Sequence, residues 1–208
     1  SLFHARMGIG FAGKDLTDYS AAWQSQSGVS TMATDRRQMA VMGNGLAVGG
    51  AADLDFGLVS YDADGFTVNI NDAPTVNQAV LTLCLAGIDA KVGVFNKSTS
   101  TSTPVAQQVT GIGFTPKCLL LMTDMAGTNG SPEAHARFGL GASDGANEGS
   151  AYFKAEDNVA DSNVDAHTDT AKIIEIGNNT TTTVDAEADT SSFDVDGFTL
   201  SWTTNNAV

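Results

Sequence analysis

One seven-residue stretch occurs twice in this chain with little change. HARMGIG covers His4–Gly10 and HARFGLG covers His135–Gly141, so the His, the Ala, the Arg and both Gly residues keep their places. A repeat at this distance constrains the fold strongly. Each copy must belong to a separate, domain-sized unit whose strands and turns resemble those of the other.

Three further matches follow in the same order along the chain. They are ATDRRQMAVMGNG (33–45) with HTDTAKIIEIGNN (167–179), YDADGFTVNI (61–70) with FDVDGFTLSW (193–202), and NQAV (77–80) with NNAV (205–208). The four matched pairs, the heptad included, lie 131, 134, 132 and 128 residues apart. We therefore expect an internal duplication with a period of about 130 residues, which indicates tandem domains and not a solenoid of short repeats.

The two copies are cut at opposite ends. The first copy continues into LTLCLAGIDAKVGVF (81–95), which predicts one or two strands that the second copy lacks, and only the second copy has the lead-in VTGIGFTPKCLLLMTD (109–124). We predict a first module over 1–95 without its leading strand, a Ser/Thr-rich linker over 96–108, and a second module over 109–208 without its closing strand. The rest of a longer chain or another subunit would supply the missing strands, or the two partial modules would complete each other.

Short apolar runs and turn signals favour strands along both copies. KCLLLMTD (117–124) predicts a strand buried on both faces, and AKIIEIG (171–177) predicts a short β-branched strand. The Asp-Gly pairs at 64–65 and 196–197 predict β-hairpins. In the strand after each turn, alternation places the apolar residues on one face. In the first copy these are Phe66, Val68 and Ile70, and in the second copy Phe198, Leu200 and Trp202.

The fold class follows from this pattern. No segment keeps a helical apolar stripe over three turns, and the stretch 151–169 is typical of a long acidic loop because Asn, Asp and Val are poor helix formers. We predict an all-β protein made of tandem antiparallel β-sandwich modules related by internal duplication. A jelly-roll-like topology is favoured because long loops separate some of the strands.

Charge and composition exclude several classes of partner. The net charge is −14, from 24 acidic and 10 basic residues, and such a surface repels phosphate backbones, so we expect no nucleic-acid partner. No apolar run reaches the ~18 residues of a membrane-spanning helix, so we expect no membrane partner. Cys84 and Cys118 lie in apolar runs, which favours buried free thiols over a disulfide.

GIGFAGKD (8–15) approaches a phosphate-binding loop, with Gly8, Gly13 and Lys14 correctly spaced. The position that should hold a Mg²⁺-binding Ser or Thr is Asp15, whose carboxylate would repel phosphates. The second copy also lacks the Lys. We therefore favour a glycine-bearing strand end and loop over a nucleotide site.

Two acidic patterns resemble cation sites. DADG (62–65) and DVDG (194–197) begin like a calcium loop, but strand residues follow where further oxygen ligands and a Glu should stand, so hairpin turns are favoured. The acidic stretch that contains His167 could also hold a cation, although a solvated loop is favoured. Its carboxylates are Asp157, Asp161, Asp165 and Asp169.

The His and Arg of the repeated heptad form the remaining candidate. His4 and Arg6, like His135 and Arg137, are two residues apart, so strand alternation places each pair on one face. A ligand site is one interpretation; a structural polar pair or a subunit contact is favoured, and a buried Arg would need a carboxylate partner. No catalytic or metal-binding motif is present and no carboxylate pair is singled out, so we predict no catalytic, cofactor-binding or metal-binding residues and no enzyme activity.

The lead-in 109–122, the Arg-Phe-Gly strand and FDVDGFTLSW together resemble a pattern of bacteriophage virion proteins. Those proteins are jelly-roll modules of tail fibres, head fibres and capsid decoration proteins. The resemblance covers most of the chain, and its motifs are structural. It implies a virion location, association with other virion proteins and with copies of itself, and a symmetric homo-oligomer such as a trimer.

The leading hypothesis is accordingly a structural component of a bacteriophage-like virion that acts through subunit association. The first alternative is a carbohydrate-binding or host-adhesion module that contacts glycans through exposed aromatic rings, for which the candidates are Trp23, Tyr19 and Tyr152. A polysaccharide-cleaving tail protein is the second alternative, and it would need a cleft with two close carboxylates.

Overall fold

The computed structural model describes residues 4–26, 33–125, 127–160 and 163–206 of the chain. These residues contain fifteen strands and no helix, and every strand pairing is antiparallel. In this part of the chain no helix is long and apolar enough to cross a membrane. The prediction of an all-β, antiparallel sandwich protein is confirmed.

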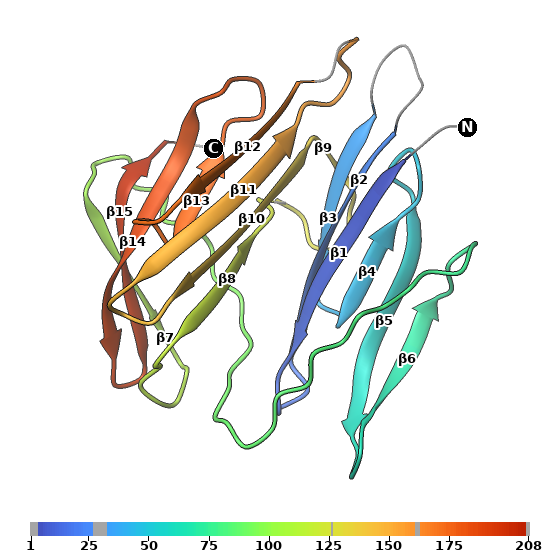
Figure 1. Cartoon of the computed structure of the whole chain (residues 1–208), viewed down its shortest axis with the longest axis horizontal. Coiled ribbons are helices and arrows are strands. Elements are labelled where there is room, and N and C mark those ends of the chain that lie inside the picture. Colours follow the sequence, from blue (N-terminus) through green and yellow to red (C-terminus); the bar gives the residue numbers. More distant parts are fainter. Residues whose placement is uncertain (1–3, 27–32, 126, 161–162, 207–208) are drawn as a thin grey trace. The chain divides into compact units, whose positions relative to one another are not determined.

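The chain divides into two compact units, and unit 1 contains seven of the described strands (Figure 1). One of its sheets has the order β1-β2-β3-β9 and the other has the order β4-β5-β6. The strands are β1 (Ala5–Ala12), β2 (Asp18–Ser25), β3 (Thr34–Met39), β4 (Gly43–Leu46), β5 (Ala52–Tyr61), β6 (Phe66–Asp72) and β9 (Glu133–Ala134).

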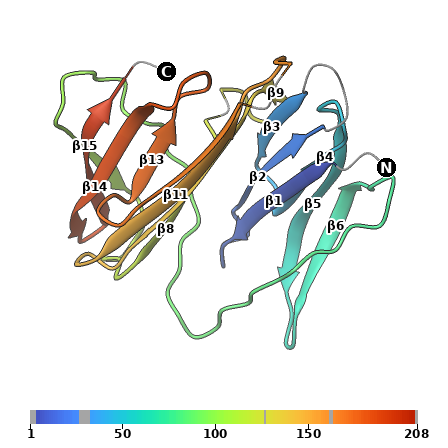
Figure 2. The same cartoon turned by 45° about the horizontal axis from the view of Figure 1, so that its top comes forward.

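Unit 2 contains the other eight described strands, in two layers that Figure 2 separates. Its sheets have the orders β12-β11-β10-β8 and β13-β14-β15-β7. The strands are β7 (Val105–Thr110), β8 (Leu119–Thr123), β10 (Ala136–Ser143), β11 (Glu148–Ala155), β12 (Val164–Asp169), β13 (Ile174–Gly177), β14 (Val184–Asp194) and β15 (Gly197–Asn205).

The core of unit 2 is a continuous apolar cluster. Buried side chains from β13, β14 and β15 form its centre, and Phe95, Val105, Val109, Leu119 and Leu121 pack against them. Phe198, Leu200 and Trp202 are among the buried side chains, which confirms the predicted apolar face of β15. This cluster therefore depends on β7, on β8 and on the segment that precedes β7.

The two units pair their strands in the same order. The series β1-β2-β3 corresponds to β10-β11-β12, and β4-β5-β6 corresponds to β13-β14-β15. The long hairpins also shift register at corresponding places, between Leu58 and Ser60 in unit 1 and between Thr190 and Ser192 in unit 2. This parallel supports the interpretation of a tandem repeat.

Unit 2 has two strands for which the described residues of unit 1 show no counterpart. There β8 pairs with the outer side of β10, and β7 pairs with the outer side of β15. In the described part of unit 1, β1 and β6 are edge strands instead.

Several sequence-based expectations are wrong in detail. Residues 151–169 are not one loop, because β11 and β12 pair across most of that stretch and leave only 156–163 between them. The run 81–95 forms no strand, since no described strand lies between Asp72 and Val105. β8 is a strand as predicted but is not buried on both faces, because it lies at a sheet edge and Leu120 is 59% exposed.

The two thiols and the expected linker also differ from their predictions. Cys84 and Cys118 are both exposed free cysteines, because the first lies in the segment without strands and the second precedes an edge strand. The expected linker 96–108 is hydrogen-bonded within unit 2, and its last four residues begin β7. Within it Lys97 donates to Asn205 Oδ1 at 2.6 Å and the Ser98 N–H donates to Gln107 Oε1 at 2.9 Å.

Candidate functional site

The glycines of the repeated heptad face the backbone of the opposite sheet. A Cβ added at Gly10 would lie 1.7 Å from the carbonyl oxygen of Met42, and one added at Gly141 would lie 1.6 Å from that of Ile173. Real Cβ atoms never approach a carbonyl oxygen so closely. The second glycine of each heptad is therefore required where the strand passes directly against the backbone that precedes β4 or β13.

The candidate phosphate-binding loop is the turn of the β1–β2 hairpin. The Gly13 N–H donates to the Thr17 carbonyl at 2.7 Å, and β2 follows where a phosphate-binding loop would begin a helix. Asp15 forms an ion pair with Lys91 and accepts the Thr17 N–H, and these interactions lower the pKa of Asp15 to about 2. The favoured interpretation, a glycine-bearing strand end and loop, is confirmed.

The arginines of the repeated heptad bind carboxylates at corresponding positions of the long hairpins. Arg6 Nη1 lies 2.9 Å from Asp53 Oδ2 of β5, and Arg137 Nη2 lies 3.1 Å from Asp185 Oδ2 of β14. Both carboxylates are buried, while the Arg6 side chain is 32% exposed and that of Arg137 only 10%. The prediction that a buried Arg would have a carboxylate partner is confirmed, and each pair links the two sheets of its unit.

Asp53 makes unit 1 sensitive to acid. Burial opposes its ionisation, but hydrogen bonds from the N–H and hydroxyl of Thr75 and the charge of Arg6 outweigh burial and lower its pKa below 3.8. A carboxyl with a lowered folded-state pKa contributes stability above its unfolded pKa and loses it as the pH falls through the folded value. The stability of unit 1 should therefore fall on acidification below about pH 4. In urea titrations between pH 3 and pH 7, Asp53→Asn should flatten this dependence, and an unchanged slope would contradict it.

The histidines of the repeated heptad are not equivalent. His4 is exposed and precedes β1. His135 precedes β10 in a left-handed conformation, with φ of 64°, and its Nδ1 accepts the Asp157 N–H at 3.0 Å. The expected placement of His135 and Arg137 on one strand face is wrong, because the strand begins only after His135.

The two acidic turns are hairpin turns with local hydrogen bonds, as favoured. Asp194 accepts the hydroxyls of Ser192 and Thr199, both at 2.8 Å, and Asp62 accepts the corresponding hydroxyls of Ser60 and Thr67. These bonds lower the pKa of Asp194. Among the described residues there is no group of three or more His, Cys, Asp or Glu side chains that could hold a metal ion.

The first residue of β2 and the first residue of β11 are carboxylates that accept a backbone N–H beside the register shift of the long hairpin. Glu148 accepts the Thr190 N–H at 2.8 Å, and Asp18 accepts the corresponding Leu58 N–H at 3.0 Å. Sequence matching missed this pair, because Asp and Glu differ and the contact spans about forty residues. In both units the carboxylate therefore binds the backbone just before the register shift of the long hairpin.

Glu148→Ala should therefore lower the free energy of unfolding of unit 2 by about 1–2 kcal/mol, since a part-buried N–H loses its acceptor. Glu148→Gln keeps an acceptor oxygen and is the matched control, with a loss of less than about 1 kcal/mol. Urea denaturation measures both. Equal losses for the two variants would show that the hydrogen bond is not the cause.

One polar cluster of unit 2 surrounds Glu175, a buried residue of β13. Ser150 donates its hydroxyl to Glu175 Oε2 at 3.3 Å, and His167 Nδ1 lies 3.1 Å from both carboxylate oxygens. A serine nucleophile would need the imidazole at its hydroxyl. Here the carboxylate lies against both side chains, so the arrangement is a polar link between β11, β12 and β13. His167 lies in β12, so the expectation of a solvated loop around it is wrong.

The described residues of the acidic stretch form further ion pairs and hydrogen bonds. Lys154, which is buried, lies 2.9 Å from Asp165 Oδ2 and donates to Asn163 Oδ1 at 3.2 Å. Asp161 lies outside the described residues.

The aromatic side chains that were candidates for glycan contact are not fully exposed to solvent. Tyr152 is buried, and Trp23 and Tyr19 are half-buried. The hollow between β8, β10 and β13, lined by Leu121, Gly141 and Glu175 among others, has no room for a water-sized molecule.

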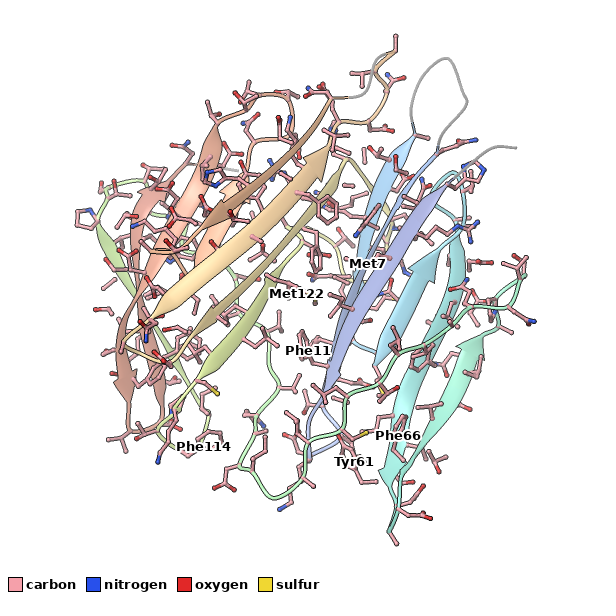
Figure 3. The ribbon with its side chains drawn as sticks, viewed as in Figure 1. Met7, Phe11, Tyr61, Phe66, Phe114 and Met122 are labelled. Atoms are coloured by element: carbon pink, nitrogen blue, oxygen red, sulfur yellow. The ribbon has the colours of Figure 1, made fainter. Side chains whose placement is uncertain are left out.

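The most distinctive surface is the open side of unit 1, which we define as the edge strands β1 and β6. Each residue of β1 from Ala5 to Gly8 is exposed, whereas the corresponding residues of β10 are all buried. On β6 the apolar face of Phe66, Val68 and Ile70 is only partly covered, and Ile70 is 51% exposed. Figure 3 shows Met7 and Phe11 on β1 and Phe66 at the start of β6. Comparison with protein-family models, with curated proteins and with solved structures found no match for this chain.

Proposed function

We propose that this protein is a structural component of a bacteriophage-like virion and that it acts through association with neighbouring subunits. The observation that supports this most directly is the open side of unit 1. An edge strand presents unpaired N–H and C=O groups, and such edges are sites of pairing with another chain. The corresponding strands of unit 2, β10 and β15, have a neighbour on both sides.

A second surface of unit 1 also supports association. The segment after β6 carries apolar side chains that alternate along the chain, and Leu81, Leu83 and Leu85 are 100%, 82% and 68% exposed. Clustered exposed apolar side chains on a protein surface mark interaction sites. A partner subunit that covers them would remove this surface from water.

The charge of the chain is compatible with a location on the outside of a particle. A net charge of −14 keeps the surface soluble and repels the packaged nucleic acid. The protein would contact other virion proteins through strand edges and apolar side chains, and would also associate with copies of itself.

The test is co-purification with particles. Particles from the source that expresses the chain are separated on a density gradient, and the fractions are quantified by mass spectrometry. A virion component should follow the major shell protein at a constant ratio and should remain after a high-salt wash. Recovery of the chain only in the particle-free fractions would overturn the proposal.

A further inference from the structure

We propose that the open side of unit 1 is the docking site for a strand–loop–strand segment of another polypeptide, with the chemistry of residues 105–125 of this chain. One strand of the segment would pair with β6 and the other with β1. This inference names the contact through which the proposed function would operate, and it rests on that function.

Unit 2 is the template for the β6 side. There β7 pairs with β15 from Val105 opposite Trp202 to Thr110 opposite Gly197. Val105 and Val109 pack against the apolar core beneath β15. β6 offers the same alternation, with Ile70 in the place of Trp202 and Phe66 in the place of Phe198.

Unit 2 is also the template for the β1 side. There β8 pairs with β10 from Leu119 opposite Ser143 to Thr123 opposite Gly139, and Leu119 and Leu121 pack against the core. In β1 the residues that correspond to Gly139 and Ser143 are Gly8 and Ala12, both small, so β1 offers comparable room beside its backbone.

Burial shows that β1 and β6 each have a free outer edge in the described part of unit 1. β10 is buried or nearly so along most of its length and β1 is largely exposed, although both carry the repeated heptad. β15 contains five buried residues, whereas β6 has none. Phe198, Leu200 and Trp202 are at most 3% exposed, and the half-exposed Ile70 stands where Trp202 would be.

The segment that follows β6 does not fill these edges. It is tied to unit 1 by a hydrogen bond from Gln78 to Asp53 and by the Lys91–Asp15 ion pair, but it forms no strand. Its apolar side chains Leu81, Leu83 and Leu85 face solvent. It therefore neither satisfies the backbone of β1 and β6 nor covers their apolar face.

Stoichiometry excludes a simple exchange between copies of this chain as the source. The described residues contain one segment of this type, β7 with β8, and unit 2 already uses it. Swapping it between copies would fill one open side and create another. The occupant is therefore a segment of this chemistry that is not already part of a sandwich.

The test uses a synthetic peptide of residues 105–125 with Cys118→Ser, added to the whole chain. Hydrogen–deuterium exchange followed by mass spectrometry reports which amides become protected. The peptide should slow exchange in both β1 and β6 by about tenfold or more at saturation, because each strand gains a hydrogen-bonded neighbour. Unchanged exchange in these strands, or new protection confined to β10 and β15, would overturn the proposal.

Matched variants test the geometry. Gln107→Pro with Gln108→Pro in the peptide removes ladder donors, so protection of β6 should be lost. In the chain, Ile70→Asp places a charge on the face that the peptide would cover and should weaken binding at least about tenfold, while Asn71→Asp on the opposite face should change it little. Equal binding by the two chain variants would also overturn the proposal.

The two proposals fail in different ways. If the peptide does not bind but the chain still co-purifies with particles, the docking site is wrong and the virion assignment stands. If the peptide binds but the chain does not co-purify with particles, the docking site stands and the virion assignment is wrong.

Discussion

Gly141→Ala is expected to destabilise unit 2 by about 3–5 kcal/mol. The new methyl group would overlap the Ile173 carbonyl oxygen, which lies 1.6 Å from the Cβ position, and the backbone before β13 would have to move. That backbone cannot move alone, because β13 is completely buried and pairs with β14. The loss should therefore appear as unfolding of the whole unit at lower urea concentration.

The measurement can be made specific to unit 2. The chain has two tryptophans, of which Trp202 lies in the core of unit 2 and Trp23 lies in unit 1. In a Trp23→Phe background, tryptophan fluorescence reports on unit 2 alone. Gly149→Ala on β11 is the control: its Cβ would lie 3.3 Å from the nearest atom, so a loss below about 1 kcal/mol is expected. If Gly141→Ala unfolds at the same urea concentration as its parent, the close approach is wrong.

Arg137→Leu is expected to destabilise unit 2 by about 3–5 kcal/mol, because it leaves the buried carboxylate of Asp185 without its cation. The double variant Arg137→Leu with Asp185→Leu should recover much of the loss, since a buried ion pair exchanged for apolar side chains is close to neutral. Urea denaturation of the two variants and their parent gives both values.

The Arg6–Asp53 pair of unit 1 is the control, because it tests how solvent exposure changes the contribution of such an ion pair to stability. Arg6 is 32% exposed, and Asp53 also accepts hydrogen bonds from Thr75 and Gln78, so Arg6→Leu should cost only about 1 kcal/mol. A loss for Arg6→Leu as large as that for Arg137→Leu would show that burial of the pair does not set its contribution. A double variant less stable than Arg137→Leu alone would show that Asp185 has a separate structural role.

Local chemistry made several features predictable from the sequence. The Asp-Gly turns indicated both long hairpins, because turn conformation depends on two or three adjacent residues. Alternation identified the buried face of β15, because successive strand residues point to opposite sides whatever they pack against. The sequence predicted that Arg137, if buried, would pair with a carboxylate, but it did not predict that this carboxylate is Asp185.

Other features depended on residues far apart in the chain. The run 81–95 has the composition of a strand and forms none, because composition alone does not make a strand and this run pairs with no other segment in the described structure. The stretch 164–169, polar and acidic, is a strand because β11 supplies that neighbour.

The sequence by itself determined that this is an all-β chain with a repeated pattern of strands and turns, since periodicity and turn chemistry are properties of neighbouring residues. Only the tertiary structure decided why the heptad repeats its second glycine, which carboxylates bind its arginines, and that unit 1 keeps two strand edges open. These depend on the distance between backbones that lie tens of residues apart, such as β10 and the residue before β13, and packing alone sets that distance.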